Sequence, residues 1–288
     1  MAKHVIVGCA GLPRGQGWPR YFQRLPYLEL GALLAGPVRS TVLRRWREAA
    51  ARPHAFGVVA PALITHSPGP RGFGPRGWPV PAGRPHDVGG FRASAEVASA
   101  HAAHLIALDL LDSAAAVYRT PPDFSPSVAN REAMRRFFSE VMTAEVAGSR
   151  VRVWHPSGLW DPPAAHAFAK ELGILCALDP LGADPTRDFA AWWDTVEGDD
   201  AYFSIGGLGR GRRTPPDQLE ALAEIADRFQ RAWVVFATSE PFPDAIRFAG
   251  MVSTGGSSDG DADAASRVDG DDDDDDDLDE EDPDENDA

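Results

Sequence analysis

Short apolar segments alternate with helix-patterned segments along most of this chain of 288 residues, and this alternation constrains the fold more than any other feature. Each apolar segment is only four or five residues long, as expected for strands buried on both faces. The eight predicted strands are residues 5–9, 27–30, 56–60, 115–118, 150–154, 174–178, 202–205 and 233–236. Helices are predicted at residues 40–51, 91–111, 127–147, 162–172, 187–193, 216–230 and 244–249.

Eight strands separated mostly by helices, in about 250 residues, is the count of a closed (β/α)8 barrel. A doubly wound open sheet is the rival arrangement. Its dinucleotide-binding form carries a GxGxxG turn after the first strand, whereas this chain has Gly8-Cys9-Ala10-Gly11 there. We therefore predict an α/β fold of the (β/α)8 TIM-like barrel class.

Two segments fall outside this alternation. Residues 67–90 hold six Pro and seven Gly and follow the third predicted strand, which places this loop at the C-terminal mouth of a barrel. Residues 259–288 contain 18 acidic residues and one Arg, with seven consecutive Asp at 271–277. Like-charge repulsion and the scarcity of apolar side chains oppose ordering there. We expect a barrel over residues 1–250 and a disordered poly-Asp tail over residues 251–288.

The formal net charge of −15 belongs to that tail, since residues 1–258 carry 25 acidic and 27 basic side chains. Bulk charge therefore gives no strong signal for nucleic-acid binding. The two cysteines, Cys9 and Cys176, cannot form a disulfide framework, and no CxxC or Cys/His ladder indicates structural zinc. No apolar run suits a signal peptide or a membrane span, so we expect a cytoplasmic protein with no membrane partner.

Five motifs occur in order between residues 4 and 250. They are VIVGCAG at 5–11, Leu28-Glu29 followed by LRRWR at 43–47, FGVVAPALITH at 56–66, YRTPPDF at 118–124, and His155-Pro156-Ser157 with Trp160. Together they resemble the motifs of the YecE-like family, a domain of unknown function with a TIM-barrel fold. The stretch at 56–66 is the most specific match. The resemblance implies a divergent member of that family.

By this alignment, the polar residues that the family carries at the ends of its strands are mostly replaced. Its Asn, Lys and Gln become Gly31, Val59 and Arg119, and the Arg and His of its seventh strand are absent from residues 202–207. The polar matches that remain are Glu29, His66, His155 and Asp179. Side chains at the C-terminal strand ends meet the substrate in nearly every barrel enzyme. The resemblance therefore implies that the ancestral catalysis has been lost.

Those four side chains are the candidate catalytic residues, because each follows or ends a different predicted strand. Carboxylates and imidazoles are ligands for divalent metals, so one interpretation is a metal site built by Glu29, His66, His155 and Asp179. The favoured interpretation is a hydrogen-bonded cluster that holds no metal or other cofactor. A nucleophilic pair of Cys9 with His66 is disfavoured, since a Cys in an apolar strand is usually a small buried hydrophobe.

The segment GGLGRGRR at residues 206–213 follows the seventh predicted strand, where barrels often bind phosphate. Its glycines allow close backbone approach and its arginines supply forked donors. The candidate anion-binding residues are Gly207, Gly209, Arg210, Arg212 and Arg213. A flexible solvated loop is the favoured interpretation, and a salt-sensitive contact with the acidic tail is a third.

We therefore expect a YecE-like barrel that acts as a binding or interaction protein without the family's catalytic groups. Its expected partners are a small anionic ligand at the barrel mouth and a basic partner for the acidic tail. The alternative is a metal-assisted hydrolase or isomerase that acts on a phosphorylated small molecule or a nucleic-acid end. In that alternative the four mouth residues are metal ligands or acid–base groups.

Overall fold

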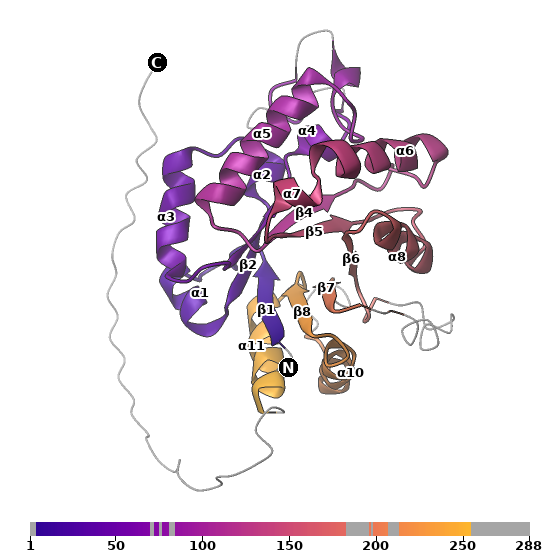
Figure 1. Ribbon diagram of the computed structural model, residues 1–288. Coiled ribbons are helices and arrows are strands. Elements are labelled where there is room, and N and C mark those ends of the chain that lie inside the picture. The colour runs from indigo at the N-terminus through magenta and orange to yellow at the C-terminus, as the bar shows by residue number, and fades with distance from the viewer. Residues whose placement is uncertain are drawn as a thin grey trace, which may run out of the picture. The chain divides into compact units, whose positions relative to one another are not determined.

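Eight parallel strands close into a barrel in which every strand pairs with the next in sequence and β1 pairs with β8 (Figure 1). The strands are β1 His4–Ala10, β2 Tyr27–Leu30, β3 Phe56–Val59, β4 Ala115–Arg119, β5 Val151–His155, β6 Leu175–Leu178, β7 Asp200–Ile205 and β8 Arg231–Phe236. This confirms the predicted (β/α)8 class. The rival open sheet is wrong, because the β1–β8 pairing leaves no sheet edge.

The computed structural model describes residues 4–254, apart from residues 70–71, 75–76, 81–83, 183–195, 197 and 207–212. The predicted helix at 187–193 lies outside the described residues. So does the predicted tail from residue 255 onward. No helix among the described residues is both long and apolar enough to cross a membrane.

Most of the longer helices were predicted, although the one at Pro241–Thr254 was predicted only over residues 244–249. The α-helices are α1 Trp18–Arg24, α2 Ala32–Ala35, α3 Ser40–Ala50, α4 Ala62–Thr65, α5 Ala95–Leu110, α6 Val128–Arg136, α7 Ala144–Ala147, α8 Pro162–Glu171, α10 Pro216–Ala226 and α11 Pro241–Thr254. Two further segments are the 3-10 helix η1 Pro85–Asp87 and the π-helix η2 Phe137–Val141. The prediction omitted α1, α2 and α4, which are too short to show a helical period.

Two predicted helices differ from the structure at identifiable residues. The helix predicted from residue 91 begins at Ala95, because the Ser94 hydroxyl caps it by accepting the Val97 N–H at 3.1 Å. The helix predicted over 127–147 is interrupted after η2, where the Thr143 side chain caps α7. Caps of this kind begin a new helix even where the apolar period continues.

The inside of the barrel is filled by alternate strand residues, as a period of two requires. The interior cluster contains Tyr27, Val59, Ala115, Val117, Val153, Ala177, Tyr202, Trp233 and Val235. Large rings are accommodated by small neighbours. A Cβ added to Gly57 would lie 1.9 Å from the Tyr27 hydroxyl oxygen, so this position has room only for glycine. Tyr202 stacks on Trp233 with ring centroids 6.4 Å apart.

The Pro- and Gly-rich loop after β3 returns to the end of α4. The Gly89 N–H donates to the Leu63 carbonyl at 2.7 Å, and the Phe91 N–H donates to the Ile64 carbonyl at 2.8 Å. Gly89 has φ of +77°, and a Cβ there would lie 2.2 Å from the His66 carbonyl oxygen. The described end of this loop therefore lies against His66, at the C-terminal side of the barrel.

Candidate functional site

Glu29 lies at the inner wall of the barrel and is 1% exposed. It follows Tyr27 by two residues on β2, so both side chains point inward. Its Oε1 accepts a hydrogen bond from Arg119 Nη2, and its Oε2 accepts one from the Tyr202 hydroxyl at 2.5 Å. The Tyr202 proton is thereby used, so the Tyr27 hydroxyl donates to Tyr202 oxygen across 3.2 Å. Both carboxylate oxygens of Glu29 are occupied.

Arg119 supplies the positive charge that compensates this buried carboxylate. It is the last residue of β4, and its Cα is paired in register with His155 on β5. The Arg119 side chain is 30% exposed, and its Nε is buried without a hydrogen-bond partner in the described structure. Arg119 stands where the resemblance led us to expect Gln. The replacement therefore installs the counter-charge for Glu29.

His155 completes this cluster beside Glu29 and Arg119. Burial lowers the pKa of His155 to about 4, with the Glu29 charge opposing that change and the Arg119 charge adding to it. The imidazole is therefore neutral at pH 7. Its Nδ1 is buried and has no hydrogen-bond partner among the described residues. We call Glu29, Arg119, His155, Tyr202 and Tyr27 the mouth cluster.

His66 lies apart from the mouth cluster. It follows α4, and its Nδ1 is 2.7 Å from the Thr65 hydroxyl oxygen. Burial lowers the pKa of His66, and the nearby charge of Asp123 opposes that change. The carboxylate whose charge raises the pKa of His66 is therefore that of Asp123.

Asp179 joins the ends of two strands. Its Oδ1 accepts the N–H groups of Leu181 and Gly182 at 3.0 and 3.1 Å, and its Oδ2 accepts the Gly206 N–H at 2.8 Å. Burial raises the pKa of Asp179, and these backbone hydrogen bonds oppose the change. The geometry is that of a brace between the end of β6 and the end of β7.

Of the four predicted residues, Glu29 and His155 both belong to the mouth cluster. His66 contacts Thr65, and Asp179 accepts backbone hydrogen bonds at the ends of β6 and β7. Within the described residues, no group of three or more His, Cys, Asp and Glu side chains is placed to hold a metal ion. Cys9 is fully buried, and burial raises its pKa to about 12. Its backbone N–H donates to the Tyr21 hydroxyl at 2.9 Å, a structural role.

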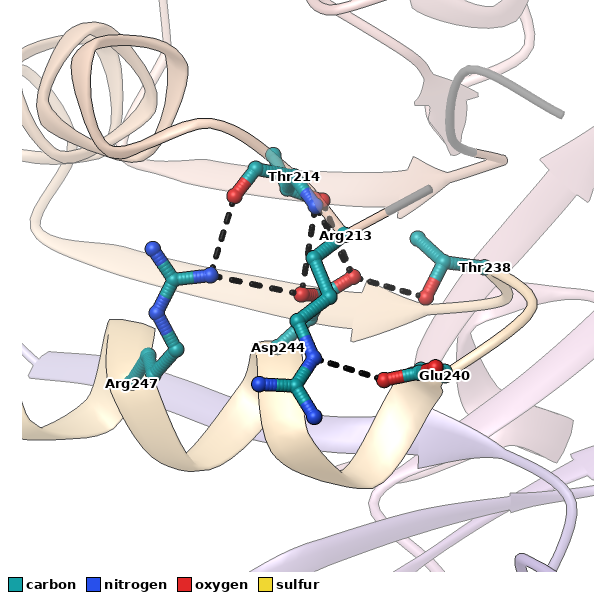
Figure 2. A network of polar contacts seen from close by, with 6 residues as sticks. All are labelled: Arg213, Thr214, Thr238, Glu240, Asp244 and Arg247. Atoms are coloured by element: carbon teal, nitrogen blue, oxygen red, sulfur yellow. Dashed lines mark hydrogen bonds and ion pairs between the residues drawn. The ribbon is translucent and has the colours of Figure 1, made fainter. Parts of the chain in front are cut away.

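The predicted anion-binding loop is described only at its ends. Gly207, Gly209, Arg210 and Arg212 lie outside the described residues. Arg213 is exposed, and its Nε donates to Glu240 Oε2 at 2.7 Å (Figure 2). That guanidinium is paired with a carboxylate of this chain at the start of α11.

A second buried carboxylate, Asp244, lies next to this pair in the first turn of α11 and is 0% exposed. Its Oδ2 accepts the hydroxyls of Thr238 and Thr214 at 2.9 and 3.0 Å, and the Thr214 N–H lies 3.3 Å from its Oδ1. Arg247 Nη1 is 3.7 Å away (Figure 2). Loops after strands seven and eight with a helix N-terminus form the usual phosphate site of a barrel. In this chain the Thr214 N–H and the hydroxyls of Thr214 and Thr238 donate to the Asp244 side chain.

Sequence reasoning missed Arg119, Tyr202 and Asp244. One signal was present for part of the mouth cluster: Tyr27 and Glu29 are two residues apart on one strand, so their side chains lie on the same face of it. Arg119 was noted only as a lost Gln, because a compensating charge on another strand has no local pattern. Asp244 was predicted to begin a helix, and its partners come from two loops distant in sequence.

Comparison with known proteins identifies the class but gives no activity. No protein-family model matches the chain, and no curated protein matches it. The matches among solved structures are all low in sequence identity, so they show the fold alone. The fold and the mouth cluster define a (β/α)8-barrel protein.

The similar structures include proteins of the DUF72 family, which is the YecE-like domain of unknown function. One from Enterococcus faecalis is 12% identical, with 92% of this chain and 100% of that chain covered and a TM-score of 0.58. One from Thermotoga maritima is 15% identical, with 86% and 99% covered and a TM-score of 0.53. A family 2 AP endonuclease from Brucella melitensis is 12% identical, with 90% and 100% covered and a TM-score of 0.54.

Proposed function

We propose that this chain is a divergent YecE-like barrel that works by binding rather than by catalysis, with a small anionic ligand at the barrel mouth. The observation that carries the proposal is the state of Glu29, whose two oxygens are held by Arg119 and Tyr202. A carboxylate compensated in this way is not free to take a proton from a substrate.

The other candidate groups support the same conclusion. Asp179 accepts three backbone hydrogen bonds, and His66 contacts Thr65. His155 has a pKa of about 4, which is far from the value near 7 that suits a general base. The Arg119 guanidinium at the mouth is partly exposed, and its N–H donors suit a phosphate or carboxylate group.

In this proposal the acidic residues 259–288 recruit a basic partner, since a long run of carboxylates attracts arginines and lysines. The expected cytoplasmic location stays a prediction. The metal-assisted alternative retains only the pair Glu29 and His155 in one place, which is fewer ligands than such sites use.

Thermal unfolding of the full chain with inorganic phosphate or acetate tests the binding proposal. A ligand present at about ten times its Kd stabilises the folded state by about 1.4 kcal/mol. We expect stabilisation of the wild type, a weaker effect in Arg119→Lys, and an unchanged effect in Arg213→Gln. Arg119→Lys keeps a cation beside Glu29, so the fold is preserved. Loss of the effect in Arg213→Gln alone, or no stabilisation at all, would contradict the proposal.

A turnover assay tests the absence of catalysis. Phosphomonoester and phosphodiester substrates are offered to the full chain with Mg²⁺, Mn²⁺ or Zn²⁺, and we expect no reaction above the buffer rate. Turnover that disappears in His155→Gln or His66→Gln would overturn the proposal and favour the metal-assisted alternative.

A further inference from the structure

Helices α1 and α3, and the residues beside them, carry exposed arginines. Helices α1 and α3 lie next to one another (Figure 1), and Trp18 of α1 stacks on Trp46 of α3 with centroids 5.2 Å apart. The exposed arginines on and beside these helices are Arg20, Arg24, Arg39, Arg44, Arg45 and Arg52. We call these six side chains the basic face.

Most guanidinium groups of the basic face are unpaired. Within the described residues, Arg20, Arg24, Arg44 and Arg45 make no hydrogen bond or ion pair, whereas Arg52 donates to the Phe22 carbonyl at 3.0 Å. Residues 11–55 contain eight arginines and only two acidic residues, Glu29 and Glu48. Because Glu29 is buried inside the barrel, Glu48 is the exposed acid of this segment.

The local excess of positive charge is unusual for this protein. Residues 1–258 as a whole are nearly neutral, and the chain carries −15. Exposed arginines that outnumber the carboxylates near them repel one another, and a polyanion on this face relieves that repulsion. The charge pattern therefore points to an anionic partner with several charges.

An acidic polypeptide fits this face better than a nucleic acid. Single-stranded nucleic acids are held by aromatic rings on which bases stack, but Trp18 and Trp46 are half-buried and stacked on each other. Carboxylates of Asp and Glu match the guanidinium fork equally well.

We propose that the basic face binds the acidic residues 259–288 of a second copy of this chain. These residues provide 18 carboxylates against one Arg, so their charge is complementary to the basic face. The proposal rests on the partner-recruiting role assigned above to residues 259–288 and names the partner. A head-to-tail contact of this kind joins copies through two different surfaces.

Sedimentation velocity of the full chain tests the association. We compare about 50 mM with about 500 mM salt, which shortens the screening length from about 14 Å to about 4 Å. We expect association at low salt and a monomer at high salt. The variant Arg20→Gln/Arg24→Gln/Arg44→Gln/Arg45→Gln should be a monomer in both. A wild type that is monomeric at every salt concentration would overturn the proposal.

A matched control removes the same charge elsewhere. The variant Arg84→Gln/Arg136→Gln/Lys170→Gln/Arg228→Gln replaces four exposed basic residues outside the basic face, so its net charge equals that of the first variant. We expect it to associate as the wild type does. Equal loss of association in both variants would show that net charge alone decides the outcome, which contradicts a specific face.

A labelled peptide of residues 259–288 separates this inference from the proposed function. We expect fluorescence anisotropy to show binding to the full chain, weakened at least tenfold in the basic-face variant and unchanged in the control. Equal binding to both variants would overturn the basic face but leave the recruiting role intact. No binding of the peptide to any of them would overturn this inference, but it would not contradict the proposed function, in which the basic partner would then be a different molecule. Tighter binding of an oligonucleotide of equal charge would favour a nucleic-acid partner instead.

Discussion

In the part of the chain that the structure describes, Glu29 and Asp244 are buried carboxylates that are stabilised in different ways. Glu29 inside the barrel is compensated by a cation, Arg119, with Tyr202 on its second oxygen. Asp244 in α11 is surrounded mainly by neutral donors from Thr214 and Thr238, with Arg247 at 3.7 Å. The difference shows that β2 and β4 are linked by charge, whereas the loops after β7 and β8 are linked by hydrogen bonds.

The largest effect is expected when the cation of the first pair is removed. Arg119→Met leaves the Glu29 carboxylate buried without a counter-charge, and breaking such a pair costs about 3–5 kcal/mol. Urea unfolding monitored by tryptophan fluorescence measures this loss of stability. Glu29→Gln in the same chain should restore much of it, because no buried charge then remains. A loss below about 1 kcal/mol in Arg119→Met would show that Glu29 does not depend on Arg119.

A smaller loss is expected at the second carboxylate. Asp244→Ala leaves the Thr214 N–H and two hydroxyls without their acceptor, at a cost of about 2–3 kcal/mol. Asp244→Asn retains an acceptor oxygen and should cost less. The same unfolding measurement applies. If Asp244→Asn lowers the free energy of unfolding as much as Asp244→Ala does, then charge rather than hydrogen bonding stabilises the contacts around Asp244. The contrast between Glu29 and Asp244 would then disappear.

The next effect is a change in proton binding by His155. Because burial and the Arg119 charge lower the pKa of His155 and Glu29 raises it, Arg119→Gln should move this pKa up from about 4. NMR titration of the imidazole in the folded protein measures the change. An unchanged pKa would place Arg119 too far from His155 to matter.

His155 also contributes to the pH dependence of the free energy of unfolding. The folded pKa of His155 lies near 4, below the usual value near 6.5 of an unfolded chain. Between these values the unfolded chain binds the proton and the folded chain does not, so stability falls as pH falls from about 6.5 to about 4. His155→Gln should weaken this dependence in unfolding experiments at a series of pH values, and the part that remains is due to other buried imidazoles such as His104, whose pKa burial lowers to about 3.

The smallest effect is expected at the surface next to Asp244. Arg213 and Glu240 form an exposed pair at 2.7 Å, and such pairs contribute little because water and salt screen them. Arg213→Gln should leave the urea midpoint unchanged within error. A clear loss of stability would mean that this pair takes part in holding the Asp244 corner.

The barrel was predictable because its strands are buried on both faces and so read as apolar runs separated by turn residues. All eight were placed, with boundaries that differ by at most two residues and with β2 in agreement at both ends. The short helices α1, α2 and α4 were not, since four to seven residues show no amphipathic period.

The mouth cluster was predictable only in part. Reading the strand ends selected Glu29 and His155, which do lie together. It also selected His66, which lies after α4 and not at the end of β3, and Asp179, whose carboxylate is held by backbone N–H groups. Arg119 and Tyr202 were missed since their role depends on a partner about 90 and 170 residues away, a relation that only the closed sheet creates.

The glycine at position 57 has a consequence for selectivity. By admitting the Tyr27 ring, it allows Tyr27, Tyr202 and Trp233 to plug the barrel beneath Glu29. The small ligand proposed for the mouth would therefore meet a depth limit at the level of the Glu29 carboxylate. Selection by ligand size would then depend on the loops above the barrel, which can vary in sequence without disturbing the filled interior.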